Sequence, residues 1–227
     1  MSRIGRLVAV GVPHHVTQRG NYRQQVFFSD EDRRVYLGLL RKYSVRYEMA
    51  IWGFCLMPNH VHLVVAPQRE DSMARAIGQT NWRYAQYVHV KRQRQGHLWQ
   101  SRFYSCPLGP AHLALAMRYV EQNPVRADLA GSAVDYEWSS ARAHVIGKDS
   151  RGLLDLRAWH AISPPEEWAQ FLGLRDSEEE IRRLIRSTHR GRPFGDEEFV
   201  ADLRTRLGRE VLSRPVGRPP KALVKSA

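Results

Sequence analysis

Cysteine is scarce in this chain, which has only two among its 227 residues. Cys55 and Cys106 lie far apart, so they form no Cys-x-x-Cys zinc motif, and both stand in apolar stretches. A disulfide-rich secreted scaffold is therefore excluded, as is a zinc site of the cysteine type. We expect two small, buried thiols in a protein that works in a reducing compartment.

Long apolar runs are also missing, and none approaches the length of a membrane span. The first ten residues have a basic start, but their apolar stretch is short, runs into Pro13 and carries no small-residue cleavage site. We therefore expect no signal peptide, no membrane partner and a cytoplasmic location. No internal repeat is visible along the chain.

Acidic residues are outnumbered, with 23 Asp and Glu against 35 Lys and Arg. The formal net charge is +12, and the isoelectric point is near 10.2. Such an excess favours a polyanionic partner, because cationic side chains that contact phosphates release counterions. Arginine greatly outnumbers lysine, and its guanidinium suits bidentate phosphate contacts. A generally basic surface without a specific ligand is the alternative.

Hydrophobic periodicity predicts an alternation of strands and helices in the first 150 residues. Strands are predicted at 15–19, at 50–56, from His60 after a Pro-Asn turn, and at 98–105; helices are predicted from Ser29, over 72–94 and from Pro110 to Asn123. The resulting order, β-α-β-β-α-β plus a helix, indicates an α+β fold. We expect a ferredoxin-like antiparallel sheet with helices on one face.

The character of the chain changes after about residue 150. Ser177 starts one short amphipathic helix, and Asp196 to Arg209 predicts another, so residues 151–212 are expected to form a helical extension. Residues 213–227 are rich in proline, basic and without acids. This tail is expected to be disordered by itself. The predicted organisation is a domain over 1–150, the extension over 151–212, and the tail.

Residues 57–65 (MPNHVHLVV) place two histidines two positions apart in an apolar, β-branched stretch. Side chains alternate between the faces of a strand, so His60 and His62 point the same way, while Val61 and Leu63 point into a core. Two neutral imidazoles side by side can bind one divalent metal ion. Ordinary hydrogen-bonded histidines are the alternative that the spacing leaves open.

Tyr119 and Asn123 are four residues apart on a predicted helix, so they share a face beside its apolar stripe. A phenol is a weak nucleophile at neutral pH without help from a base or a metal. An ion at His60 and His62 could polarise a scissile phosphate for Tyr119. Asn123 offers an amide oxygen as a third ligand, and this donor set suits Mg²⁺ or Mn²⁺. A packed amphipathic aromatic is the alternative for Tyr119.

Three separated segments resemble, in this order, the REP-associated tyrosine transposases: 57–62 (MPNHVH), 96–103 (GHLWQSRF) and 118–127 (RYVEQNPVRA). Residues 17–21 (TQRGN) and 138–140 (WSS) also fit. These proteins are relatives of the small single-strand DNA transposases of the His-hydrophobe-His (HUH) superfamily. The resemblance is strong over about residues 10–145 and weak over the rest.

This resemblance implies a ferredoxin-like nuclease domain whose tyrosine attacks a phosphodiester of single-stranded DNA. The products are a 5′-phosphotyrosine and a free 3′-hydroxyl, and the covalent link keeps the bond energy, so rejoining needs no ATP. The resemblance further implies that His60 and His62 bind the metal and that Tyr119 is the nucleophile. Asn123 stands where many relatives in the wider superfamily carry glutamine, so the third ligand is less directly implied. The family's substrates are short palindromic repeats that fold as hairpins.

Single-strand binding combines a basic groove along the backbone with aromatic side chains that stack on bases. We expect phosphate contacts from Arg19 and Arg102, and a further contact from Arg83 on the basic helix. Arg218 lies in a Gly-Arg-Pro segment of the tail that resembles the core of an AT-hook, with a solvated basic tail as the alternative. Candidate stacking residues, for which core packing is the alternative, are Trp82, Tyr84, Tyr87, Trp99, Phe103 and Tyr104.

The favoured function is therefore a metal-dependent, tyrosine-type DNA strand transferase that acts on hairpin DNA as a monomer or homodimer. A non-catalytic DNA-binding regulator would use the same charge, tail and aromatic side chains. A zinc hydrolase is a weaker alternative, because no Glu lies at the usual general-base spacing and no third strong nitrogen or sulfur ligand is evident.

Overall fold

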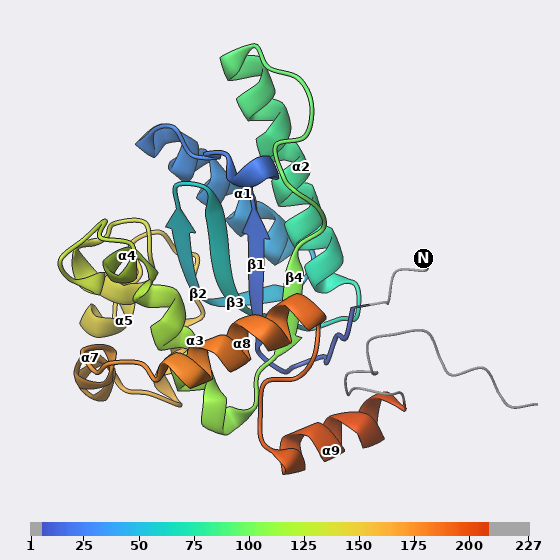
Figure 1. Ribbon diagram of the computed structural model, residues 1–227, viewed down its shortest axis with the longest axis vertical. Helices are drawn as coiled ribbons and strands as arrows, with labels where there is room; N and C mark the ends of the chain where they lie inside the picture. Colours follow the sequence, from blue (N-terminus) through green and yellow to red (C-terminus); the bar gives the residue numbers. More distant parts are fainter. Residues whose placement is uncertain (1–5, 209–227) are drawn as a thin grey trace, which may run out of the picture.

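The computed structural model describes residues 6–208. Its centre is a four-stranded antiparallel sheet with the strand order β2-β3-β1-β4 (Figure 1). The strands are β1 (His14–Arg19), β2 (Met49–Met57), β3 (His60–Pro67) and β4 (Tyr104–Pro107). The expected α+β fold with a ferredoxin-like sheet is thus confirmed.

Strands β2 and β3 form the predicted hairpin around the Pro-Asn turn. In the ladder between β1 and β3, Thr17 lies opposite His62 and Arg19 lies opposite His60. Residues that lie opposite each other in an antiparallel pair point to the same face of the sheet. The register therefore gathers these four side chains on one face.

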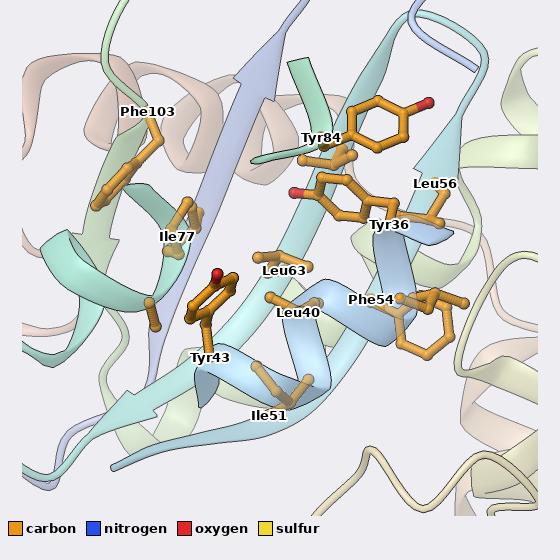
Figure 2. Packing of buried hydrophobic residues seen from close by; sticks show 14 of the residues in the cluster. Tyr36, Leu40, Tyr43, Ile51, Phe54, Leu56, Leu63, Ile77, Tyr84 and Phe103 are labelled. Atoms are coloured by element: carbon orange, nitrogen blue, oxygen red, sulfur yellow. The ribbon is translucent and has the colours of Figure 1, made fainter. Parts of the chain in front are cut away.

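Helices α1 (Asp30–Arg46) and α2 (Ser72–Arg92) cover one face of the sheet. Figure 2 shows large side chains of the helices packed against those of the strands; the residues include Tyr36, Leu40, Tyr43, Ile77 and Tyr84 from the helices and Phe54 and Leu63 from the strands. Burying one large apolar side chain contributes about 1.5–3 kcal/mol. This cluster therefore holds both helices on the sheet.

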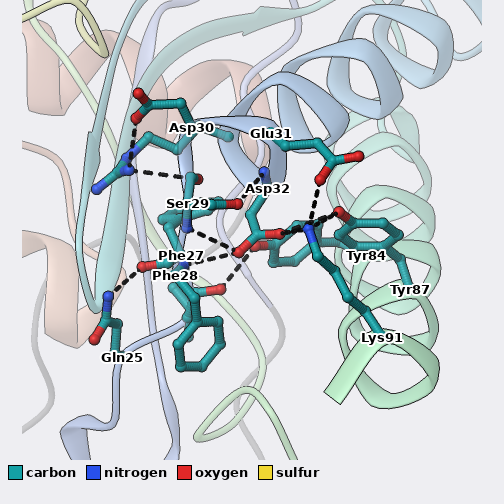
Figure 3. Close-up of polar contacts among 12 residues, drawn as sticks. Gln25, Phe27, Phe28, Ser29, Asp30, Glu31, Asp32, Tyr84, Tyr87 and Lys91 are labelled. Atoms are coloured by element: carbon teal, nitrogen blue, oxygen red, sulfur yellow. Dashed lines mark hydrogen bonds and ion pairs between the residues drawn. The ribbon is translucent and has the colours of Figure 1, made fainter. Parts of the chain in front are cut away.

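A reciprocal capping box begins α1. The Ser29 hydroxyl accepts a hydrogen bond from the Asp32 backbone N–H (3.3 Å), and the Asp32 carboxylate accepts one from the Ser29 backbone N–H (3.1 Å). The same carboxylate accepts hydrogen bonds from Tyr87 (3.1 Å) and Lys91 (2.9 Å) of α2 (Figure 3). One buried carboxylate thus caps one helix and ties it to the next.

Helices α3 (Pro110–Glu121) and α8 (Glu178–Arg190) lie on the other face of the sheet, where α3 packs on β2 and β3, and α8 packs on β4 and β1 (Figure 1). The single-turn helix α4 (Asn123–Arg126) follows α3 almost directly. The predicted helix after Pro110 therefore lies against the face of the sheet opposite to α1 and α2.

The remaining elements of the described chain are short. They are η1 (Asn21–Arg23), η2 (Ala133–Asp135), α5 (Ala141–Ile146), α6 (Leu156–His160), α7 (Pro165–Leu172) and α9 (Glu197–Leu207). The fully buried Glu121, at the end of α3, accepts hydrogen bonds from the Ser140 hydroxyl and from Trp168 Nε1 (2.9 Å). This buried carboxylate anchors the end of α3 to the segments around α5 and α7.

Two boundaries differ from the sequence predictions. The fourth strand was expected at 98–105, but β4 covers only Tyr104–Pro107. Trp99 forms an isolated antiparallel bridge with Gly20, and the Gln100 N–H donates to the Arg19 carbonyl (2.9 Å), so this segment still pairs with the end of β1. Residues 101–103 leave the ladder and separate it from β4. The helix expected to end at Asn123 ends two residues earlier, and Pro124 fits the first turn of α4, where its missing N–H costs nothing.

The cysteines, the helix lengths and the C-terminal region bear on the remaining sequence predictions. Cys55 and Cys106 are both buried and unpaired with each other, as predicted. Within residues 6–208, no helix combines the length and the apolar character needed to cross a membrane. Helices α6 to α9 form the expected C-terminal helical region. The boundaries 1–150 and 151–212 stay predictions, and the tail over 213–227 lies outside the described residues.

Candidate active site

His60 and His62 lie on β3 and face the layer that contains α3 and α8. Their neighbours Val61 and Leu63 are fully buried beneath α1 and α2, so the alternation of the strand turns both imidazoles to the other side. The ring centroids are 4.9 Å apart, with planes at 80°. The two rings share a face as the spacing predicts, whereas their binding of a metal stays a prediction.

Both imidazoles are neutral at physiological pH. Burial, together with the smaller effect of the nearby charge of Arg19, lowers the pKa of His60 to about 4. Burial also lowers the pKa of His62 well below its usual value, with further contributions from His60 and His15. Neutral imidazole is the form that binds metal ions.

The donor atoms at this place fit a divalent cation. His60 Nδ1 lies 2.6 Å from Asn59 Oδ1, and His62 Nδ1 lies 2.9 Å from His15 Nε2, so Nε2 is the ring nitrogen of each that can bind a metal. Asn123 donates from Nδ2 to the carbonyls of Tyr119 (2.9 Å) and Val120 (3.4 Å), which leaves its amide oxygen for a cation.

Oxygen ligands would have to complete such a site. Within the described residues, no group of three or more His, Cys, Asp or Glu side chains is arranged to hold a metal ion. Two imidazoles, one amide oxygen and water are a donor set that suits Mg²⁺ or Mn²⁺. The residues present therefore fit the cofactor that the sequence predicts.

Tyr119 projects from α3 beside the histidine pair. Its ring centroid lies 5.5 Å from that of His62 and 5.8 Å from that of His15, both with the ring edges facing. The side chain is 8% exposed. Burial raises the pKa of the phenol, although the charges of Arg126 and Arg19 act in the opposite direction. The phenol is therefore protonated at neutral pH and needs help to act as a nucleophile.

Arg126 holds its guanidinium over the Tyr119 ring, 4.5 Å from the centroid. Its Nη2 donates to the Tyr119 carbonyl, and its Nη1 forms an ion pair with Asp176 (2.8 Å). Asp176 also pairs with Arg118 Nε (2.6 Å). These contacts fix a positive charge beside the phenol.

One pocket of about 360 Å³ contains most of the predicted residues. Among its lining residues are Arg19, His60, His62, Tyr119, Asn123 and Arg126. A larger hollow of about 740 Å³, beside η2 and α7, contains none of the residues predicted from the sequence. The smaller pocket is the candidate active site, because it joins donor atoms for a cation, a phenol and positive charge.

Helix α8 forms one wall of this pocket through Ile185, Thr188 and His189. The Thr188 hydroxyl lies 2.8 Å from His15 Nδ1, and the His189 ring lies 4.8 Å from the ring of Tyr104, centroid to centroid. The helical extension therefore contributes side chains to the candidate active site.

Sequence reasoning missed several residues of this pocket. The alternation of β1 could have placed His15 on the face of Arg19, because the two are four residues apart on one strand. Arg126 lies within the segment 118–127 that carries the family resemblance. Thr188 and His189 carry no local signal, since only the tertiary fold brings α8 to β1 and β4.

The other predicted DNA-binding residues lie elsewhere. Arg102 is exposed and does not line the pocket. Arg83 is exposed on α2, on the opposite face of the sheet, with its guanidinium 4.5 Å from the ring centroid of the half-exposed Trp82. Arg218 lies outside the described residues. Contacts of these three arginines with DNA stay predictions.

Residues 10–123 match the model of a family described as "Transposase IS200 like". The fold is similar to the solved structure of a REP-associated tyrosine transposase bound to a REP hairpin, with a TM-score of 0.55 and 19% identity over 69% of this chain and 90% of that one. A putative transposase from Deinococcus radiodurans R1 matches with a TM-score of 0.37 and 21% identity, over 53% of this chain and 97% of that one. No curated protein matches the chain.

Proposed function

Because this chain belongs to the family of IS200-like transposases, we propose that it cleaves and rejoins single-stranded DNA through Tyr119. Membership confirms the transposase resemblance drawn from the sequence, and it implies DNA binding, enzymatic DNA processing and transposition. The observation that carries the finer proposal is the pocket in which the Tyr119 ring lies 5.5 Å from that of His62, beside His60 and Asn123.

Transposases of this family generally use divalent metal ions. We propose that His60 and His62 hold Mg²⁺ or Mn²⁺ through Nε2, and that Asn123 adds its amide oxygen. When bound there, the ion supplies Lewis-acid polarisation of the scissile phosphate. The neutral state of both imidazoles and the orientation of the Asn123 amide support this assignment.

In the proposed cleavage step, Tyr119 Oη attacks phosphorus and forms a new O–P bond while the bond to the 3′-oxygen breaks. The phenol gives its proton to solvent, and the departing 3′-oxygen takes one, so the products are a 5′-phosphotyrosine and a 3′-hydroxyl. Arg126 and Arg19 bind phosphate oxygens and stabilise the charge that develops on them. The reverse attack of the 3′-hydroxyl restores the phenol and rejoins the strand.

We propose hairpin DNA of the REP type as the substrate. Support comes from the basic composition, from the exposed Arg19 at the pocket, and from the REP hairpin bound to the structural relative. Action as a monomer or homodimer, in the cytoplasm, stays as predicted from the sequence.

The decisive experiment detects the covalent adduct. Full-length protein is incubated with Mn²⁺ and hairpin DNA labelled at its 3′ end, because a 5′-phosphotyrosine link leaves the 3′ part of the strand on the protein. Denaturing gels should show a labelled protein band, and mass spectrometry should locate the DNA on Tyr119. Tyr119→Phe should abolish the band while hairpin binding persists.

Tyr43→Phe is the matched control, because Tyr43 belongs to α1 and is 6% exposed in the core on the opposite face of the sheet. It should form the adduct normally. The double variant His60→Ala with His62→Ala should lose cleavage. An undiminished adduct in Tyr119→Phe, or cleavage without any divalent metal, would overturn the proposal. Hairpin binding with no nicking would favour the non-catalytic regulator.

A further inference from the structure

A line of hydrogen bonds runs from α8 to the proposed metal ligand His62. Thr188 Oγ1 donates to the Leu184 carbonyl (2.8 Å) and lies 2.8 Å from His15 Nδ1. His15 Nε2 lies 2.9 Å from His62 Nδ1. The three side chains are buried, with exposures of 1% for Thr188, 1% for His15 and 4% for His62.

The relative orientation of the two rings supports a direct bond between them. The planes of His15 and His62 differ by only 8°, and the ring centroids are 5.2 Å apart. Because His15 Nε2 and His62 Nδ1 are only 2.9 Å apart while the centroids are 5.2 Å apart, these parallel rings lie end to end, so an N–H of one ring points at the nitrogen lone pair of the other. Neutral imidazole has one donor nitrogen and one acceptor nitrogen. The direction of each hydrogen bond in the line therefore determines the direction of the next.

The proton positions follow from the partners. Thr188 has one hydroxyl proton and donates it to Leu184, so its oxygen accepts from His15 Nδ1–H. The buried Cys106 thiol, 3.2 Å from the same oxygen, can donate its own proton there. His15 Nε2 is then an acceptor, so His62 carries its proton on Nδ1. His62 Nε2 therefore keeps a lone pair.

We propose that Thr188 and His15 are positioning residues that hold His62 in its Nδ1–H tautomer and so present Nε2 to the cation. The inference rests on the proposed function only for the cation; the tautomer follows from the hydrogen bonds. Partners of this kind fix the orientation and the tautomer of metal-binding histidines, and their loss typically lowers metal affinity about 10- to 100-fold.

Thr188 belongs to α8, so this line of hydrogen bonds depends on the helical extension as well as on the sheet. The bond to His15 joins residues 173 positions apart, and Thr188 lies beyond the residues 10–123 that match the family model. His60 is held differently, through the side chain of its chain neighbour Asn59. One ligand of the pair is thus oriented locally, and the other through the helical extension.

The first test reads the tautomers directly in the metal-free, full-length protein. With ¹⁵N-labelled histidine, long-range ¹H–¹⁵N spectra distinguish protonated from unprotonated ring nitrogens, and the signals are assigned from single-histidine variants. Wild-type protein should show Nδ1–H for both His15 and His62. A wild-type His62 that is protonated on Nε2 would overturn the inference without reference to any variant.

The second test compares Thr188→Val, which removes the hydroxyl at nearly constant volume, with Thr188→Ser, which keeps it. In Thr188→Val the Nδ1–H of His15 loses its acceptor, so His62 should shift toward the Nε2–H tautomer. Titration with Mn²⁺, followed by electron paramagnetic resonance, should show an affinity at least tenfold lower. Thr188→Ser should retain the wild-type tautomers and Mn²⁺ affinity, with thermal unfolding showing that both variants are folded.

Unchanged tautomers and unchanged Mn²⁺ affinity in Thr188→Val would overturn the positioning role. A wild-type protein that shows the assigned tautomers but binds no Mn²⁺ would overturn the proposed function, while supporting control of the His62 tautomer by Thr188 and His15. The failure of one proposal is therefore distinguishable from the failure of the other.

Discussion

At the scale of single residues, Arg126 links the phenol to the helical extension. It stacks on the Tyr119 ring, donates to the Tyr119 carbonyl and pairs with Asp176. A planar guanidinium can make these contacts together because its donors point in several fixed directions, whereas a lysine ammonium is a compact point charge. The geometry of Arg126, beyond its charge, therefore matters for the site.

We predict that Arg126→Lys lowers the rate of adduct formation about tenfold or more, which corresponds to roughly 1.4 kcal/mol in the barrier. Single-turnover assays with labelled hairpin DNA would measure this rate. Arg46→Lys is the matched control, because Arg46 also lies over a tyrosine ring, that of Tyr47, but on α1. Equal rates in wild type and Arg126→Lys would show that charge alone suffices.

Asn123 is the least directly implied of the three proposed metal ligands. We predict that Asn123→Ala weakens Mn²⁺ binding about tenfold, or roughly 1.4 kcal/mol, through loss of one oxygen ligand. Calorimetric titration of Mn²⁺ measures the affinity, and the unfolding midpoint shows whether loss of the bond to the Tyr119 carbonyl disturbs the helix. An unaltered affinity would remove Asn123 from the ligand set.

Local periodicity explains how much of the candidate site is predictable. His60 and His62 share a face by strand alternation, and Tyr119 and Asn123 line the same pocket by helical spacing. Arg83 could not be placed this way, since composition does not say which face of the sheet a helix covers. The role of Thr188 could not be predicted from the sequence, because it depends on a contact between residues 173 positions apart.

At the scale of secondary-structure elements, Asp32 joins α1 to α2. Burial of its carboxyl raises the pKa, but hydrogen bonds from Lys91, from the Phe28 N–H and from Tyr87 outweigh burial and hold the pKa below the usual 3.8. The folded protein therefore binds this proton less readily than the unfolded chain does. Stability from this carboxylate is fully present above the unfolded pKa and is lost as pH falls through the lower, folded pKa.

We predict that Asp32→Asn lowers the free energy of unfolding at neutral pH, and that its difference from wild type shrinks in acid, below about pH 4. Urea unfolding at a series of pH values would measure both. A difference that stays constant down to about pH 3 would mean that the Asp32 carboxylate contributes no pH-dependent stability. Figure 3 shows the contacts that the variant would disturb.

The elements themselves were mostly predictable, because their signals are local. Ser29 caps α1 as expected, and β3 begins at His60 as expected. The strand predicted at 98–105 is interrupted: Trp99 pairs with Gly20 at the end of β1, but residues 101–103 leave the ladder before β4 begins at Tyr104. Extra residues of this kind are set by the pairing with the partner strand, for which the local sequence carries no signal.

At the scale of the whole molecule, the net charge of +12 should govern how tightly DNA is held. We predict that the affinity for a hairpin falls steeply with salt, with a slope in log–log form of about −0.7 to −0.9 for each phosphate neutralised. Fluorescence anisotropy between roughly 50 and 200 mM salt would measure it. A flat profile would contradict electrostatic binding along the DNA backbone.

The contribution of α8 to the pocket has a consequence for biosynthesis. A ribosome produces the histidine pair and Tyr119 long before it reaches Thr188, which bonds to His15 across 173 positions. A nascent chain, or one cut short by a premature stop codon, therefore carries the proposed nucleophile without the support that orients His62. The proposed active site is therefore fully supported only after the ribosome has synthesised α8.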